Sequence, residues 1–418
     1  MSTTVQSATD IRPFHVDVPE EKLTDLRRRV AATRWPQREL VDDQSQGVQS
    51  ALMEALTRYW VADYDWRKCE AELNALPQFK TEIDGLDLYF IHVKSPHEHA
   101  LPLIMTHGWP GSVIEMLEVV GPLVEPTAHG GRAEDAFDVV LPSLPGYGFS
   151  DAPLEVGWDQ NRTAKAWAEL MNRLGYTHYV AQGGDQGASV TDAMGRMAPD
   201  GLVGVHFNFL SSFPTDVLAA VFGGGAAHGL FKRLAVATLA AHAERTELTA
   251  LEGVEAIFKR GYIVEMPEHP QTVGFALTDS PVGLAAWMLD HDADSYEKIS
   301  HAFIDGKTTG GLTRDRVLDN ITLYWLTNTA TSSARIYWEE GRGIAAAIAS
   351  GQKPPKLSLP VAFTVFPDEL FEAPRKWAEK VYPNLIYFNE VDKGGHFAAW
   401  EEPALFASEL REAFRSLR

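Results

Sequence analysis

Short amphipathic stretches separate polar ones over the first hundred residues. Between residues 19 and 35, three apolar residues recur at helical spacing among charges: Leu23, Leu26 and Val30. This spacing predicts a surface helix, and a second helical stretch follows at 48–60. The run 86–93 has strand composition. We expect these elements to form an N-terminal segment over 1–95 that is too poor in apolar residues to be an independent domain.

Continuous apolar runs replace this pattern from residue 101 onward. The runs 101–106, 137–141 and 178–181 are typical of strands buried in a parallel sheet. Between the last two runs, four apolar residues line one helical face: Ala164, Trp167, Met171 and Leu174. Alternating strands and helices predict an α/β domain.

The alternation lapses in the second half of the chain. Helical patterns dominate residues 211–350, and strand patterns resume at 357–366 and 385–391. A helical insertion would lie over the carboxyl ends of the strands, where open α/β sheets bind ligands. We therefore expect a helical cap over 211–350, inserted between a first core part at 96–210 and a second at 351–418.

The composition is that of a packed globular protein. The chain has 418 residues, and its 37 Lys+Arg against 57 Asp+Glu give a formal net charge of −20. Because binding to a phosphate backbone needs a basic surface, no nucleic-acid partner is expected. Cys69 is the single cysteine, so no intramolecular disulfide can form, which favours a reducing compartment.

The sequence shows no targeting or anchoring signal. Residues 1–10 are polar and lack the basic start and the apolar run of about 7–15 residues that a signal peptide requires. No stretch approaches the roughly 18 apolar residues of a membrane span. We therefore expect a soluble, cytoplasmic protein without a membrane anchor, and both a monomer and a homo-oligomer stay open.

A glycine-rich turn after the run 178–181 carries the most informative motif. The sequence Gly183-Gly-Asp185-Gln-Gly187 has the spacing of a nucleophile elbow, with Asp185 where serine usually stands. The following helix N-terminus would stabilise an anionic side chain. Taken alone, the segment equally fits a plain strand-to-helix turn with an aspartate N-cap.

Two further residues follow later strands in a telling order. Glu369 comes after the strand pattern ending at residue 366, and His396 lies in the loop after the next one. The catalytic triads of α/β-hydrolases follow the same order along the chain: first the nucleophile, then the acid, then the histidine. In that fold, two backbone N–H groups form the oxyanion hole, here those of Trp109 and Gln186. A cis bond before Pro110 would aim the first of them inward.

Competing motifs fail on spacing or context. Lys307 follows a glycine, as the lysine of a P-loop does. The position where a P-loop needs its first glycine, however, is occupied by His301. Ser150 lies in a Gly-x-Ser segment without a strand-to-helix transition. His97 and His99 flank a glutamate in a polar loop and lack a third ligand at useful spacing. We therefore expect neither a metal nor a cofactor.

An aspartate nucleophile implies a two-step reaction. Asp185 would attack an electrophilic carbon and form an ester, and His396, oriented by Glu369, would activate water to hydrolyse that ester. Epoxides and haloalkanes suit this chemistry. An opening epoxide becomes an alkoxide and needs an acid, and the expected cap offers the phenols of Tyr262 and Tyr337.

The sequence resembles the microsomal-type epoxide hydrolases and their soluble bacterial relatives over nearly the whole chain. Six segments carry the resemblance: FHVDVP at 14–19, FKTEIDGLD at 79–87, HGWPGS at 107–112, PSLPGYGFS at 142–150, DSPVGLAA at 279–286 and GGHFAAWEEP at 394–403. It implies an α/β-hydrolase fold with a mainly parallel sheet, a helical cap and an N-terminal wrapping segment. It places the nucleophile, base, acid and ring-opening tyrosines at Asp185, His396, Glu369, Tyr262 and Tyr337.

The resemblance also implies a substrate and exposes two departures. The partners would be a small epoxide, bound against Trp109, Tyr262 and Tyr337, and water. The family usually has Trp where this chain has Gln186, and we expect no counterpart of the membrane anchor of the animal enzymes. A haloalkane dehalogenase-like hydrolase and a catalytically silent binding protein are the alternatives. The sequence does not separate a detoxifying from a biosynthetic role.

Overall fold

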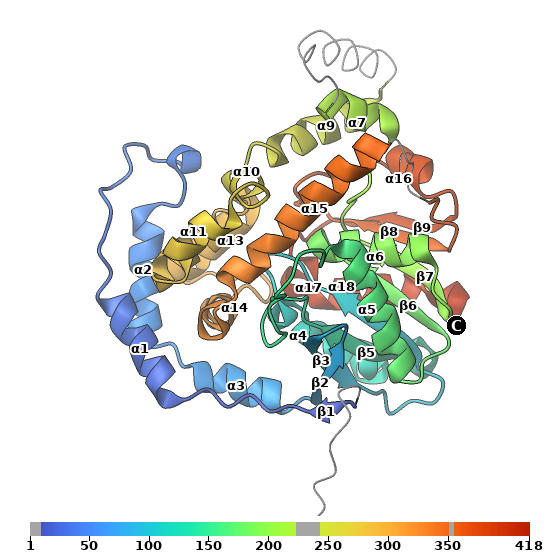
Figure 1. The fold of residues 1–418 in the computed structure, drawn as a ribbon, viewed down its shortest axis with the longest axis horizontal. Helices are drawn as coiled ribbons and strands as arrows, with labels where there is room; N and C mark the ends of the chain where they lie inside the picture. The colour runs from blue at the N-terminus through green and yellow to red at the C-terminus, as the bar shows by residue number, and fades with distance from the viewer. Residues whose placement is uncertain (1–9, 223–242, 351–354) are drawn as a thin grey trace, which may run out of the picture.

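A nine-stranded sheet lies at the centre of the described residues, which are 10–222, 243–350 and 355–418 of a computed structural model (Figure 1). Its spatial order is β1-β2-β3-β5-β4-β6-β7-β8-β9. The strands are β1 (Arg12–Pro13), β2 (Gln78–Ile83), β3 (Leu86–Val93), β4 (Leu101–Thr106), β5 (Phe137–Pro142), β6 (Tyr179–Gly183), β7 (Leu202–Phe207), β8 (Val361–Val365) and β9 (Leu385–Glu390). Pairings from β1 to β5 are antiparallel and those from β5 to β9 are parallel, so the predicted α/β sheet is confirmed.

Helices cover both faces of the parallel part. The core helices are α4 (Leu117–Val124), α5 (Gln160–Arg173), α6 (Asp185–Met197), α16 (Arg375–Val381), α17 (Ala398–Glu401) and α18 (Pro403–Ala413). Short 3-10 turns lie at Gln44–Gln46, Val113–Met116, Pro126–His129, Ala133–Asp135 and Arg415–Leu417. The chain steps from β4 to β5 in one direction and from β5 to β6 in the other, so right-handed crossovers place α4 and α5 on opposite faces. Helix α18 packs with α4, and α6 packs with α5.

Two predicted elements end earlier or begin later than their patterns suggest. The apolar run 357–366 predicts a longer strand than β8, because Pro360 has no N–H to donate and pairing begins at Val361. The last apolar stripe predicts one helix through Leu417. Helix α18 ends at Ala413, and a 3-10 turn carries Leu417 instead.

The N-terminal segment runs along the outer side of the helices that follow β7 (Figure 1). It contains α1 (Glu20–Ala31), α2 (Ser50–Ala62) and α3 (Trp66–Asn74). The three apolar residues of the first predicted helix are buried on α1, as expected for an amphipathic helix. Trp60 on α2 donates from Nε1 to Thr322 Oγ1 at 3.2 Å, and the Tyr64 hydroxyl lies 2.8 Å from Asp319 Oδ1. The segment therefore packs on helix α14 (Arg314–Thr327), which belongs to the insertion.

The insertion between β7 and β8 is helical, as predicted. Its helices are α7 (Thr215–Phe222), α9 (Arg245–Ile257), α10 (Gly261–Glu265), α11 (Pro270–Leu277), α12 (Pro281–Leu289), α13 (Ala293–Ile304), α14 (Arg314–Thr327) and α15 (Ala330–Ser350). Residues 1–9, 223–242 and 351–354 of the predicted segments lie outside the described residues. The exact domain limits stay predictions.

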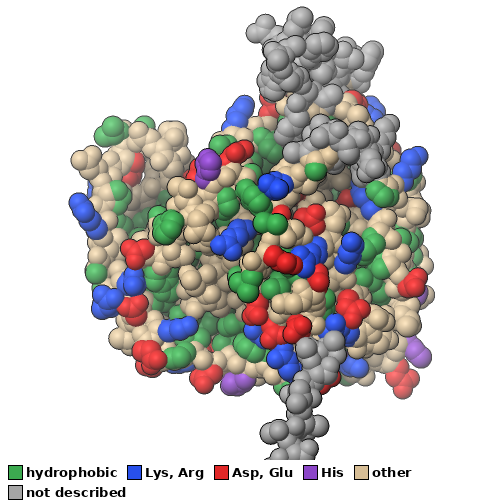
Figure 2. Space-filling model, viewed as in Figure 1, with side chains coloured by type: hydrophobic (Ala, Val, Ile, Leu, Met, Phe, Trp, Pro, Cys, Tyr) green, Lys and Arg blue, Asp and Glu red, His purple; other side chains and the backbone are tan. Residues whose placement is uncertain are grey.

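Acidic and basic side chains are interspersed over the face drawn in Figure 2. Such a mixed surface is well hydrated and presents no broad field of one sign there. None of the helices in the described ranges combines the length and the apolar character needed to cross a membrane.

Candidate active site

Asp185 lies at the tip of a tight turn between β6 and α6. Its φ of 47° falls in the left-handed region that non-glycine residues rarely adopt. Glycines let the turn close, because a Cβ at Gly183 would lie 2.1 Å from the carbonyl oxygen of Gly187. Helix α6 begins at Asp185, with Gly184 as N-cap and no side-chain cap hydrogen bond. The alternative of a simple aspartate N-cap is therefore wrong, and the turn has the form of a nucleophile elbow.

The structure brings the three predicted triad residues together from separate loops. His396, after β9, has its Nδ1 atom 2.5 Å from Oε1 of Glu369, which follows β8. The Nε2 atom of His396 lies 3.6 Å from Oδ2 of Asp185. The side chains of His396 and Glu369 are only 2% and 3% exposed. A buried imidazole therefore stands between two carboxyl groups.

The loop after β4 approaches Asp185 from another side. The bond between Trp109 and Pro110 is cis, and the backbone N–H of Trp109 donates to Asp185 Oδ1 at 2.8 Å. Helix α14 holds this loop, because Asn320 Nδ2 donates to the carbonyl oxygen of Pro110 at 2.7 Å. Gln186, the residue after Asp185, is buried at the start of α6.

Two cap tyrosines complete an aromatic wall at this site. Tyr262 on α10 and Tyr337 on α15 are both buried. The Trp109 ring centroid lies 4.8 Å from that of Tyr262 and 6.1 Å from that of Tyr337. The Tyr337 hydroxyl is buried without a hydrogen-bond partner among the described residues. The predicted substrate-contacting residues are thus neighbours, although they come from the core and from two cap helices.

The buried charges shift the ionisation of the site. Burial would lower the pKa of His396, but the carboxylates of Glu369 and Asp185 outweigh it and raise the pKa to about 10. Burial, reinforced by Asp185, raises the pKa of the Tyr262 and Tyr337 phenols well above their usual range. The free protein at neutral pH therefore has a protonated His396 and two phenol groups that can donate a proton.

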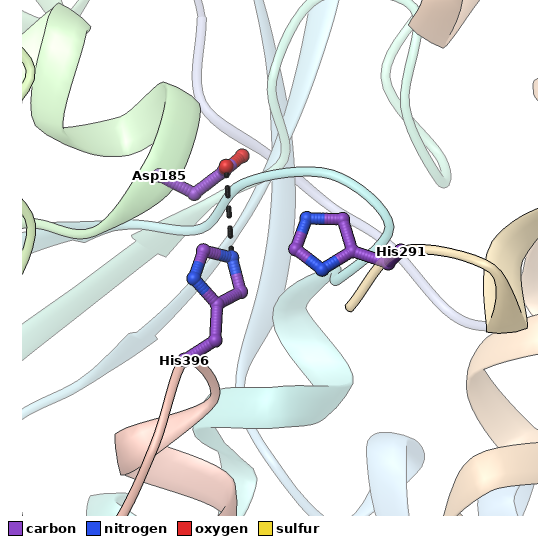
Figure 3. A group of neighbouring side chains, drawn as sticks. All are labelled: Asp185, His291 and His396. Carbon is purple, nitrogen blue, oxygen red and sulfur yellow. Dashed lines mark ion pairs between the residues drawn. The ribbon is translucent and has the colours of Figure 1, made fainter. Parts of the chain in front are cut away.

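His291 also reaches the site, and the sequence reading does not single it out. It lies in the loop between α12 and α13, and its ring centroid is 4.5 Å from that of His396. Figure 3 shows both imidazoles beside the Asp185 carboxylate. The three side chains have ligand atoms within 4.8 Å of one another, so they are the group of described residues that could hold a metal ion. Only the flanking aspartates in Asp290-His291-Asp292 offer a sequence signal.

Glu115 is a second buried group that the motifs do not reveal. It lines a cavity shared with Asp185 and His396. Burial raises the pKa of its carboxyl to about 8. A Cβ at Gly111 would overlap the Glu115 carboxyl, so this glycine leaves the space that the side chain fills.

The competing serine has a structural role. The Ser150 hydroxyl donates to the carbonyl oxygen of Ser143 at 2.8 Å and accepts from the Tyr89 N–H at 3.0 Å. It therefore links the chain after β5 to β3. Cys69 is buried, and burial raises the pKa of its thiol, so it is not a reactive thiolate.

The strand order and the aspartate elbow, with a histidine and an acid after later strands, define an α/β-hydrolase. Residues 102–206 match the family described as alpha/beta hydrolase fold, and residues 11–116 match the one described as Epoxide hydrolase N terminus. The chain belongs to the epoxide hydrolase family.

Relatives over the whole chain support this assignment. The chain is 52% identical to a Stigmatella aurantiaca protein named "Putative epoxide hydrolase". The alignment covers 98% of this chain and 86% of that protein. It is 36% identical over 96% of its length to 88% of epoxide hydrolase 1 of Sus scrofa. The solved juvenile hormone epoxide hydrolase of Bombyx mori superposes with a TM-score of 0.82 at 29% identity, covering 98% of this chain and 95% of that one.

Proposed function

We propose that this protein hydrolyses an epoxide to a vicinal diol through a covalent ester on Asp185. The observation that carries the proposal is a carboxylate nucleophile enclosed by a histidine base and two buried phenols. Hydrolysis of a haloalkane needs no acid, because a halide leaves as a stable anion. The Tyr262 and Tyr337 hydroxyls instead match the alkoxide that forms as an epoxide opens.

The first step opens the ring. An oxygen of the Asp185 carboxylate attacks one epoxide carbon, the bond from that carbon to the ring oxygen breaks, and the ring oxygen takes a proton from Tyr337 or Tyr262. The phenolate left behind is re-protonated by the His396 imidazolium. Ester formation removes the charge of Asp185, one of the carboxylates that raise the pKa of His396. His396 therefore becomes neutral when a base is needed.

The second step hydrolyses the ester. Water gives one proton to Nε2 of His396, and its oxygen bonds to Cγ of Asp185. The N–H groups of Trp109 and Gln186 stabilise the oxyanion that forms. The intermediate expels the second diol oxygen, which takes the remaining water proton, and Asp185 returns as a carboxylate beside a protonated His396. This end state has the same protonation as the starting one.

One turnover in ¹⁸O-water, with enzyme in excess over a broadly accepted epoxide such as styrene oxide, tests the proposal. We expect the label in the peptide that contains Asp185 and an unlabelled diol, because the diol oxygen comes from the carboxylate. Asp185→Asn should abolish turnover, and Asp200→Asn, an exposed aspartate after α6, is the matched control. Label appearing directly in the diol would reject the ester. Halide release from chloroalkanes without turnover of any epoxide would favour a dehalogenase, and no turnover at all would favour a binding protein.

A further inference from the structure

His291 carries a buried acceptor atom that the reaction described above does not use. The side chain is 2% exposed, and its Nδ1 atom lies 2.8 Å from Oδ2 of Asp292. Its Nε2 atom is buried and has no hydrogen-bond partner among the residues that the structure describes. Leaving a buried polar atom without a partner is unfavourable, so such an atom usually has a ligand or water to bind.

The tautomer of His291 follows from its neighbour. The Ser295 N–H donates to Oδ1 of Asp292 at 2.7 Å. Although burial acts against ionisation, the hydrogen bond from His291 and the nearby charges hold the pKa of Asp292 below its usual range. Burial and the charge of His396 lower the pKa of His291, so this ring is neutral. A neutral ring beside an ionised carboxylate keeps its proton on Nδ1, which leaves a lone pair on Nε2.

That lone pair faces the position where the ester must be hydrolysed. The ligand atoms of Asp185, His291 and His396 all lie within 4.8 Å of one another (Figure 3). Two acceptors that share one water molecule lie about 4.5 Å apart when each hydrogen bond is about 2.8 Å long. The upper limit of 4.8 Å is therefore compatible with one water molecule that both imidazoles bind beside the carboxyl group.

We propose that His291 positions the hydrolytic water by accepting its second hydrogen on Nε2, while His396 accepts the first. This inference rests on the function proposed above. With both hydrogens directed to imidazoles, a lone pair of the water oxygen is left to attack Cγ of the Asp185 ester. His396 alone takes a proton from the attacking water. The second proton stays on the oxygen until the alkoxide leaves and takes it, so His291 ends the step neutral.

The stacking of the rings fixes this orientation. The His291 ring is stacked on Tyr262, with centroids 5.0 Å apart and planes 25° apart. Asp292 restrains the same ring at Nδ1. Held at one edge and on one face, the ring has little freedom to turn Nε2 away from the site. His291 is thus a positioning residue for the second half-reaction only.

Single-turnover kinetics on three variants tests this role. His291→Phe keeps an aromatic ring beside Tyr262 but removes Nε2, His291→Gln keeps a polar end, and His291→Met is a second apolar replacement. His301→Gln, an exposed histidine on α13, is the matched control. Ester formation is followed by the fluorescence of Trp109 and its neighbours, and the ester is quantified by the mass of the Asp185 peptide after acid quenching.

We expect His291→Phe and His291→Met to slow ester hydrolysis about 10- to 100-fold while the rate of ester formation changes less than about 3-fold. The ester should accumulate in these variants, and His291→Gln should recover part of the rate. A structural defect would lower both rates together. Equal loss of both rates, or unchanged hydrolysis in both apolar variants, would overturn the role of His291. A wild-type protein that forms no ester would instead overturn the proposed function.

Discussion

The backbone N–H of Trp109 donates to Oδ1 of Asp185, which leaves Oδ2 toward His396, 3.6 Å from its Nε2 atom. The two oxygens of one carboxylate are therefore distinguished before any substrate binds. The N–H that holds Oδ1 in the free protein is the donor that would stabilise the oxyanion during ester hydrolysis. A preorganised donor of this kind needs no reorientation between the two steps.

Replacing His396 should separate the two half-reactions. In His396→Gln, Asp185 still has its N–H donor and can attack the epoxide, but no base remains to activate water. We expect the ester to form and persist, with steady-state turnover reduced at least about 10²-fold. Mass spectrometry of the intact protein after mixing with an epoxide would show one added substrate mass. A variant that shows no adduct with an epoxide that the wild type consumes would contradict the two-step route.

The two phenols should act at ring opening rather than at hydrolysis. Tyr337→Phe and Tyr262→Phe should each slow ester formation about 10-fold or more, and the double variant should slow it about 10²- to 10⁴-fold. Stopped-flow fluorescence under single-turnover conditions measures this rate. Tyr176→Phe, whose hydroxyl contacts Asp138 away from the site, is the control. An unaffected double variant would mean that another group supplies the proton.

Glu369→Gln should lower the pKa of His396. The variant loses a carboxylate that stabilises the imidazolium, whereas burial, which disfavours the charged ring, is unchanged. A folded pKa raised from 6.5 to about 10 stabilises the fold fully below pH 6.5 and loses that contribution as the pH rises to about 10. The variant should therefore be less stable than the wild type at pH 6, and the difference in stability should shrink as the pH rises from 6.5 to about 10. Denaturant unfolding against pH and histidine NMR titration check both effects, with Glu372→Gln as control. An unchanged His396 titration would show that Glu369 does not set it.

Replacing Glu115 with a residue that cannot ionise should stabilise the protein at alkaline pH. Burial raises the pKa of Glu115 in the folded protein from 4.5 to about 8. The carboxyl group therefore destabilises the folded state increasingly as the pH rises from 4.5 to about 8, and by a constant amount above that. Glu115→Gln should leave stability near that of wild type at pH 4 and increase it by on the order of 4 kcal/mol at pH 8. Urea unfolding at both pH values measures the difference. Equal shifts at both values would trace the effect to packing instead.

Most of the site can be predicted from the sequence, because the alternation of strands and helices indicates at which edge of the sheet each loop lies. Asp185, Glu369 and His396 each follow a strand, and parallel strands bring such loops together. His291 follows a helix of the cap, and its contact with His396 depends on how the cap packs on the core. Local patterns do not encode that packing. The Glu115 environment is hidden for a similar reason, since it depends on the space left beside Gly111.

Helix α14 links parts of the chain that look unrelated in sequence. One side of it receives Trp60 of the N-terminal segment through Thr322, and Asn320 holds the carbonyl of Pro110 next to the oxyanion donor. The N-terminal segment and the loop that carries the oxyanion donor thus both contact helix α14, so a shift of this helix would move both of them. Changes in that distant segment can alter turnover without touching any residue that meets the substrate.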